Sequence, residues 1–389
     1  MEITFANRKL QELCEQERIA QKKLGLNRTA AQIQQLIDGE LAIDESIARK
    51  LAEILGSTEE FWLKSEQLYR SRLAKLAAEK QQLLQWFDWL KTLPVKALMK
   101  QAAISERRID EKNKPDIVRD CLRFFRVASP AEWEDRCRGM QAAFRRTRAQ
   151  QSDEGAISAW LRLGEIAAAD IHPPNYDRVK FERAVREIRK LTILPPAEFI
   201  PKIERLCFEA GVVFVLVPSI PKAHTSGVAR WLTDDKPLIQ LSLYGRTNDR
   251  FWFTFFHEVA HILLHSKEEI FLDECDGSEV LAPVREQEAQ ADLWSREWLI
   301  PPEYVVELNG LRRSKQEVQK FADRLSIHPA IVVGRLQHEK KIRIDSMNGF
   351  KEKLTVGSDF NADDRSFREF DRVLSYVMDK NQELYKQLS

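Results

Sequence analysis

Two histidines and a glutamate have a spacing that suits metal chemistry. His257, Glu258 and His261 form the pattern His-Glu-x-x-His in an otherwise apolar stretch. On a helix, residues four apart share one face, so both imidazoles can reach one metal ion with the glutamate beside them. Imidazole ligands favour zinc, and Glu258 would act as the base on a water molecule that zinc activates. A buried helix with a polar stripe is the alternative interpretation.

A catalytic zinc ion needs a third protein ligand. His265 lies eight residues beyond His257, which is roughly 12 Å along a helix axis and too far for both to bind one ion. Position 267, where metzincins carry a third histidine, is a lysine. Glu288 and Asp292 remain, one helical turn apart, in the arrangement typical of gluzincins. Asp292 would accept the spare N–H of a ligating histidine and fix its tautomer.

The elements that position these residues follow from apolar periodicity. We expect helices at about 250–265 and 286–300, the second ended by Pro301-Pro302. Two further helices, Ser314–Leu325 and Pro329–Gln337, carry an apolar stripe that predicts core packing or a protein partner.

Apolar runs rich in β-branched residues predict a small sheet before the His-Glu-x-x-His helix. The expected strands are Gly211–Val217, Val228–Leu232 and Leu238–Leu243. The last strand directly precedes the helix. It is either an edge strand that pairs with an extended substrate or an ordinary core strand.

Five stretches between about residues 190 and 355 carry a resemblance to a known family: Ser226–Trp231, Leu238–Leu243, Phe251–His265, Glu288–Pro301 and Val332–Gln337. Together they resemble the ImmA/IrrE family of zinc metallo-endopeptidases. The resemblance implies that His257, His261 and Glu288 are zinc ligands and that Glu258 is the catalytic base. It also implies a typical substrate, a helix–turn–helix repressor that controls stress genes or a mobile element. The family often has Asn where Asp292 stands, and both accept a hydrogen bond.

The group that would stabilise an oxyanion is not identified by this resemblance. The candidates are Tyr244, His224, Arg230 and His338. Arg230 also suits a salt bridge, and His224 suits a surface role. Cys275, in the loop between the two ligand helices, is either a redox-sensitive cap on the zinc or a plain loop cysteine.

The N-terminal stretches Gln35–Glu40, Ile43–Gly56 and Glu60–Arg70 resemble the helix–turn–helix of XRE-type regulators, in the HigA-like branch. The recognition helix would span about Thr29–Asp38. Its side chains that could read adenine edges or contact phosphates are Gln32, Gln34 and Gln35. Residues 1–80 carry 13 Lys+Arg and 13 Asp+Glu, and a neutral module binds DNA weakly unless it dimerises or clusters its basic residues. The alternative is a helical dimerisation or partner-binding domain.

Length and composition restrict the class of protein. The 389 residues predict two or three domains, and the net charge of +1 excludes binding of nucleic acid by bulk charge. Five scattered cysteines without a CxxC pair favour a reducing compartment. No apolar stretch approaches the roughly 18 residues of a membrane span, and the N-terminus has no signal segment. We therefore expect a soluble, cytoplasmic protein.

These observations predict a mostly helical α+β fold with a small antiparallel or mixed sheet. The expected parts are a helix–turn–helix module at 1–80, a helical linker region at 81–190, a gluzincin-like metallopeptidase domain at 191–355, and an amphipathic C-terminal helix at 356–389. That helix would be a lid on the site or a dimer arm.

The expected function is that of a zinc-dependent endopeptidase fused to a DNA-binding-like module. It would cleave a repressor and so control stress, toxin–antitoxin or mobile-element genes. Promoter DNA, a toxin and a second copy of the chain are further expected partners. The alternative is a non-enzymatic, antitoxin-like DNA-binding regulator whose metal site is structural or inactive.

Overall fold

The computed structural model describes seven parts of the chain: residues 34–36, 38–144, 153–242, 247–265, 271–274, 282–312 and 314–354. For residues 138–144, 271–274 and 282–285 it describes the backbone only. The chain divides into two compact units, residues 1–85 and 86–389.

In the described part of the smaller unit lie the helices α4 (Glu45–Leu55) and α5 (Glu59–Gln85). Asp44 caps α4, because its Oδ1 accepts the backbone N–H of Ile47 at 2.8 Å. Gly56, with a φ of 84°, ends this helix. A small core holds the two helices together and is made of Ile47, Ala48, Leu51 and Trp62.

The expected recognition helix lies mostly outside the described residues. Residues 34–36 are helical, and Gly39 follows in the left-handed region with a φ of 74°. Gln34 and Gln35 are exposed, and Gln34 Nε2 donates to Asp38 Oδ1 at 2.9 Å. Gln32 is outside the described residues. The helix–turn–helix and its DNA contacts therefore stay predictions, as does the C-terminal helix, which lies beyond residue 354.

The larger unit begins with a series of helices, which confirms the expectation of a mostly helical chain. Prolines stand in the first turn of several of them, where the missing N–H has no helical partner to lose. The helices are α6 (Val95–Lys100), α7 (Lys114–Phe125), α8 (Pro130–Phe144), α9 (Glu154–Ala168), α10 (Arg178–Lys190) and α11 (Pro196–Glu209).

A mixed sheet follows, in agreement with the predicted fold class. Its strands are β1 (Val213–Leu216), β2 (Thr225–Thr233), β3 (Lys236–Leu241) and β4 (Phe271–Glu274), in the order β1-β3-β2-β4. β1 runs parallel to β3, whereas β2 is antiparallel to both β3 and β4. β4 was not predicted, because its four residues lie within a polar stretch.

The interpretation of the 238–243 strand as a substrate-binding edge is wrong. β3 is hydrogen-bonded on both sides, with Ile239 opposite Phe214 of β1 and Ala229 of β2. Its backbone groups are therefore already paired and cannot receive a further strand. In the sequence, a central strand that is buried on both faces is only a continuous run of apolar residues. Such a run does not show which strands pair with it.

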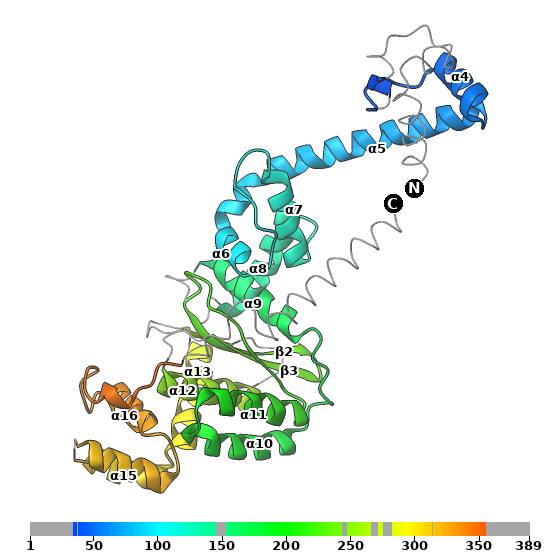
Figure 1. The fold of residues 1–389 in the computed structure, drawn as a ribbon. Coiled ribbons are helices and arrows are strands. Elements are labelled where there is room, and N and C mark those ends of the chain that lie inside the picture. The colour runs from blue at the N-terminus through cyan, green and yellow to red at the C-terminus, as the bar shows by residue number, and fades with distance from the viewer. Residues whose placement is uncertain are drawn as a thin grey trace. The chain divides into compact units, whose positions relative to one another are not determined.

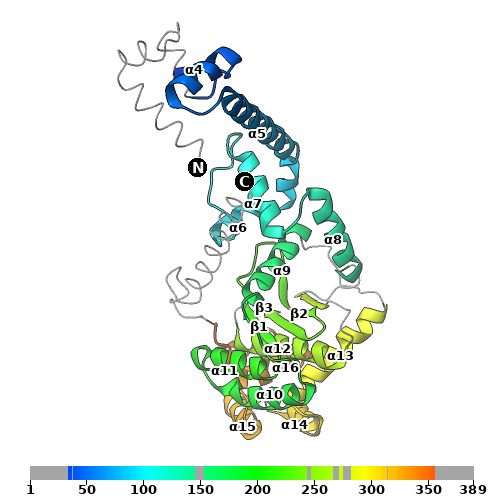
Figure 2. The same cartoon turned by 90° about the vertical axis from the view of Figure 1, so that its right-hand side faces the viewer.

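The sheet lies between two helices, α9 on one face and α12 (Asn248–Leu264) on the other (Figures 1 and 2). On the α9 face, Gln240 Nε2 donates to Trp160 O at 2.7 Å, and Arg230 Nη2 donates to Leu161 O at 2.8 Å. On the opposite face, Ile239 packs in the same core as the aromatic residues of α12.

The main core encloses α12 and the helices that follow it. These are α13 (Ala282–Leu299), α14 (Val305–Gly310), α15 (Lys315–Leu325) and α16 (Pro329–His338). The apolar stripe of α15 and α16 lies in this core, which confirms core packing; its residues are Val318, Phe321, Ala322, Leu325, Ile331, Val332 and Leu336. Among the described residues, no helix combines the length and apolar character of a membrane span.

Candidate metal centre

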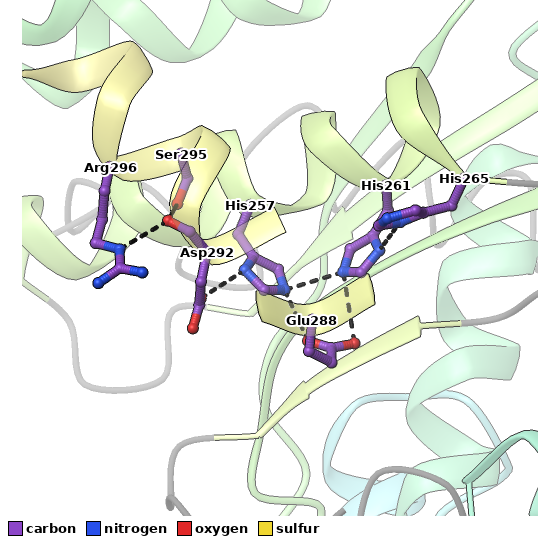
Figure 3. A network of polar contacts seen from close by, with 7 residues as sticks. All are labelled: His257, His261, His265, Glu288, Asp292, Ser295 and Arg296. Carbon is purple, nitrogen blue, oxygen red and sulfur yellow. Dashed lines mark hydrogen bonds and ion pairs between the residues drawn. The ribbon is translucent and has the colours of Figure 1, made fainter. Parts of the chain in front are cut away.

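Two packed helices carry the candidate metal ligands. His257 and His261 project from α12 toward Glu288 on α13 (Figure 3). His257 Nε2 lies 3.0 Å from His261 Nε2 and 3.1 Å from Glu288 Oε2, and His261 Nε2 lies 3.6 Å from Glu288 Oε1. One ligand atom from each residue lies within 4.8 Å of the other two, so this cluster could hold a metal ion.

The packing of α12 and α13 explains this meeting. His257 and His261 are nearly fully buried, with relative exposures of 5% and 3%. Ala291, which is fully buried on α13, leaves room for the helices to approach. Ala289, on the same helix, is exposed and takes no part in this approach.

Asp292 holds the ring proton of His257 on Nδ1, the nitrogen that faces away from the cluster. Its Oδ1 lies 3.0 Å from His257 Nδ1. Partial burial raises the pKa of Asp292, but the hydrogen bond with His257 and the charges of His257, Arg296 and His338 hold it below its usual range. The ionised carboxylate therefore accepts the Nδ1 proton, so Nε2 is the ring nitrogen of His257 that could ligate a metal ion.

His261 is the second imidazole of the cluster. Burial lowers its pKa well below the usual range, and the neighbouring His257 and His265 lower it further. Two imidazole nitrogens and a carboxylate oxygen thus converge on one point, and these electron-pair donors suit a cation bound between them. The residues therefore fit a divalent metal ion with nitrogen and oxygen ligands.

Glu258 lies beside the cluster, fully buried against the sheet. A Cβ atom at Gly227 of β2 would lie only 2.6 Å from Glu258 Oε1 and 2.8 Å from Thr254 Cγ2. Only glycine leaves space for the carboxylate in this position. No role was predicted for Gly227, although a glycine inside a strand often marks the close approach of another group.

The other predicted candidates lie in different places. Arg230 points to the α9 face of the sheet, where its Nη1 lies 3.0 Å from Glu165 Oε1 in the salt bridge that the sequence suggested. His224 is half-buried with a φ of 47°. His338 is exposed on α16, close enough to Asp292 for its charge to lower the pKa of that carboxyl. His265 approaches the Nδ1 side of His261, away from the ligand atoms. Tyr244 and Cys275 are outside the described residues.

Comparison with known proteins gives one family. Residues 212–337, about a third of the chain, match the model of the IrrE N-terminal-like domain, Peptidase_M78. The matched region runs from the start of the sheet to the end of α16 and so contains all three candidate ligands. No curated protein matches the chain. The match supports the ImmA/IrrE family and a metallopeptidase-type function for this region.

Proposed function

We propose that this protein is a zinc-dependent endopeptidase in which His257, His261 and Glu288 hold the metal and Glu258 is the catalytic base. The convergence of one ligand atom from each of these three residues on one point carries this proposal. Two histidines and a carboxylate are the ligand set of many catalytic zinc sites, which keep a fourth position open for substrate.

The residues of this chain divide the work of peptide hydrolysis. When bound, zinc supplies a Lewis acid that polarises the peptide carbonyl and acidifies a water molecule. Glu258 takes the proton of the attacking water and then returns it to the leaving amine. Asp292 holds His257 in the ligating tautomer. Gly227 gives Glu258 the space to stand beside the metal.

The sheet also suggests where an extended substrate binds. β4 is the outermost of the described strands next to β2, and it lies in the segment that joins the two ligand helices. An extended peptide that adds to β4 would place its backbone near the metal ligands. We assign the substrate to this edge in place of β3.

The first experiment measures the zinc content and the peptidase activity of the wild-type protein and of the Glu258→Gln variant. We expect about one zinc per chain in both, because Glu258 is not a ligand. We expect cleavage of a peptide library to fall by about 10²–10⁴-fold in the variant, the usual contribution of a general base. Glu297→Gln, at an exposed position of α13, is the matched control.

Two outcomes of this experiment would contradict the proposal. A fully active Glu258→Gln protein would exclude Glu258 as the base. A wild-type protein that takes up no zinc, even after reconstitution, would exclude the enzyme and leave the DNA-binding regulator as the leading function.

We further propose that the substrate is a helix–turn–helix repressor in the cytoplasm. The N-terminal unit would bind promoter DNA near the site where that repressor is bound. The resemblance of both parts of the chain to known families supports this, and Gln34 and Gln35 are exposed. Gel-shift binding at low salt should weaken in Gln34→Ala and Gln35→Ala while the zinc content stays unchanged. Absence of DNA binding at low salt would contradict the DNA-binding part alone.

A further inference from the structure

The nitrogen of His261 that faces away from the cluster meets a second imidazole. His261 Nδ1 lies 2.9 Å from Nδ1 of His265, and the ring centroids are 4.9 Å apart (Figure 3). His265 stands one helical turn beyond His261, and its backbone N–H donates to His261 O at 3.2 Å. On its other side, His265 Nε2 lies 3.3 Å from Oε1 of Gln290 on α13.

The chemistry of these groups determines which atom donates and which accepts in each hydrogen bond. An amide oxygen only accepts, so His265 Nε2 carries the proton that it shares with Gln290. In the neutral ring, Nδ1 of His265 then bears the lone pair. His261 must donate from its own Nδ1, which leaves the lone pair of its Nε2 pointing at His257 and Glu288.

We propose that His265 is a positioning residue that selects the ligating tautomer and the ring orientation of His261. The inference rests on the proposed function, since it assumes that His261 ligates the metal. His265 does for His261 what the carboxylate of Asp292 does for His257. A metal-ligating histidine usually donates its other ring N–H to an oxygen acceptor, and here a neutral imidazole takes that place.

The same geometry shows that His265 is not placed to act as a metal ligand itself. His265 contacts the Nδ1 edge of His261, whereas the other two candidate ligands lie at the Nε2 edge. A single ion bound at Nε2 is therefore reached by Glu288 and not by His265. Gln290 anchors the far side of His265 to α13, the helix that supplies Glu288.

The test compares His265→Leu with His265→Asn in the full chain. Leucine fills the space without an acceptor, whereas the side-chain oxygen of asparagine accepts a hydrogen bond near the place of Nδ1. His172→Leu, at an exposed position after α9, is the control. Zinc affinity is measured by competition with a chromophoric chelator, and the visible spectrum of the cobalt-substituted protein reports the ligand geometry.

We expect His265→Leu to weaken zinc binding by about 10–100-fold and to change the cobalt spectrum, the usual result of losing such a partner. The zinc affinity of His265→Asn should stay within about threefold of that of the wild type. The zinc affinity of the control, His172→Leu, should equal that of the wild type. Circular dichroism and the thermal stability of the metal-free proteins verify that the variants fold alike.

Three results would overturn the inference while the proposed function stands. One is a His265→Leu protein that binds zinc as tightly as the wild type. Another is a loss as large as that of His261→Ala, which would make His265 a ligand. The third is a folded His265→Asn protein as weak as His265→Leu, which would exclude the acceptor role. If the wild type itself binds no zinc, the proposed function fails instead.

Discussion

Glycine 227 carries no side chain at the point where β2 passes the buried carboxylate of Glu258. The ideal Cβ position at Gly227 lies 2.6 Å from Glu258 Oε1, well inside van der Waals contact. Thr254 and Leu241 close the remaining space, with the nearest atom of each 2.8 Å from that position. An added methyl group here would push the carboxylate aside, so the position of the base depends on the absence of a side chain at Gly227.

This contact predicts that Gly227→Ala lowers activity without removing the metal. We expect peptide cleavage to fall by roughly 10²-fold, since a displacement of about 1 Å can cost that much. Zinc content should stay near one per chain, because no ligand contacts Gly227. Gly310→Ala is the control, since an added Cβ there has no atom within 4 Å. A fully active Gly227→Ala protein would show that the base tolerates the displacement.

At the scale of elements, α16 begins at an unusual cap. His328 Nδ1 accepts the backbone N–H of Ala330 at 3.2 Å and lies 3.1 Å from Asn248 Nδ2 of α12. Both contacts need a lone pair on Nδ1. Burial lowers the pKa of His328, although the charges of Glu352 and Asp249 oppose the shift. The cap therefore joins two helices of the core only while His328 Nδ1 is unprotonated.

This cap predicts a stability that decreases in mild acid. The pKa of His328 is lower in the folded than in the unfolded protein, so below about pH 6.5 the unfolded chain binds more protons. The free energy of unfolding should therefore fall as the pH drops from 7.5 through 6.5 toward the folded pKa. His328→Asn, which caps without titrating, should show a smaller fall.

Denaturant unfolding of the chelator-treated protein at pH 7.5 and 5.5 measures this difference. His172→Asn, at an exposed position, is the matched control and should keep the wild-type dependence. Equal pH dependence in His328→Asn and the wild type would show that the cap does not titrate in this range.

At the scale of the whole molecule, the two compact units have separate cores. The core of the smaller unit contains Ile47 and Trp62, whereas the main core contains residues from Phe181 to Leu354. The division falls after Gln85. All three candidate ligands, and the sheet against which α12 packs, belong to the larger unit.

We therefore predict that a fragment of residues 86–389 folds and binds zinc without the N-terminal unit. Its zinc affinity should stay within about threefold of the full chain, because no ligand or partner of a ligand is removed. Zinc titration and circular dichroism of the purified fragment test this. A fragment that aggregates, or that binds zinc far more weakly, would show that the larger unit depends on residues 1–85.

Features that depend on neighbours along the chain can be predicted from the amino-acid sequence. A helix repeats every 3.6 residues, so the spacing of His257, His261, Glu288 and Asp292 predicted which side chains share a face. Apolar periodicity likewise predicted α12, α13, α15 and α16 to within a few residues. These elements use hydrogen bonds between residues close in the chain, and their propensities are therefore legible in the sequence.

Which distant segments of the chain meet depends on how the elements pack. Strand pairing joins residues far apart, so the sequence could not show that β3 is central or that β4 pairs with β2. The same holds for Gly227 beside Glu258 and for Gln290 beside His265, which come together only when β2 and α13 pack against α12. Such contacts result from packing over the whole core, and no local pattern of residues encodes them.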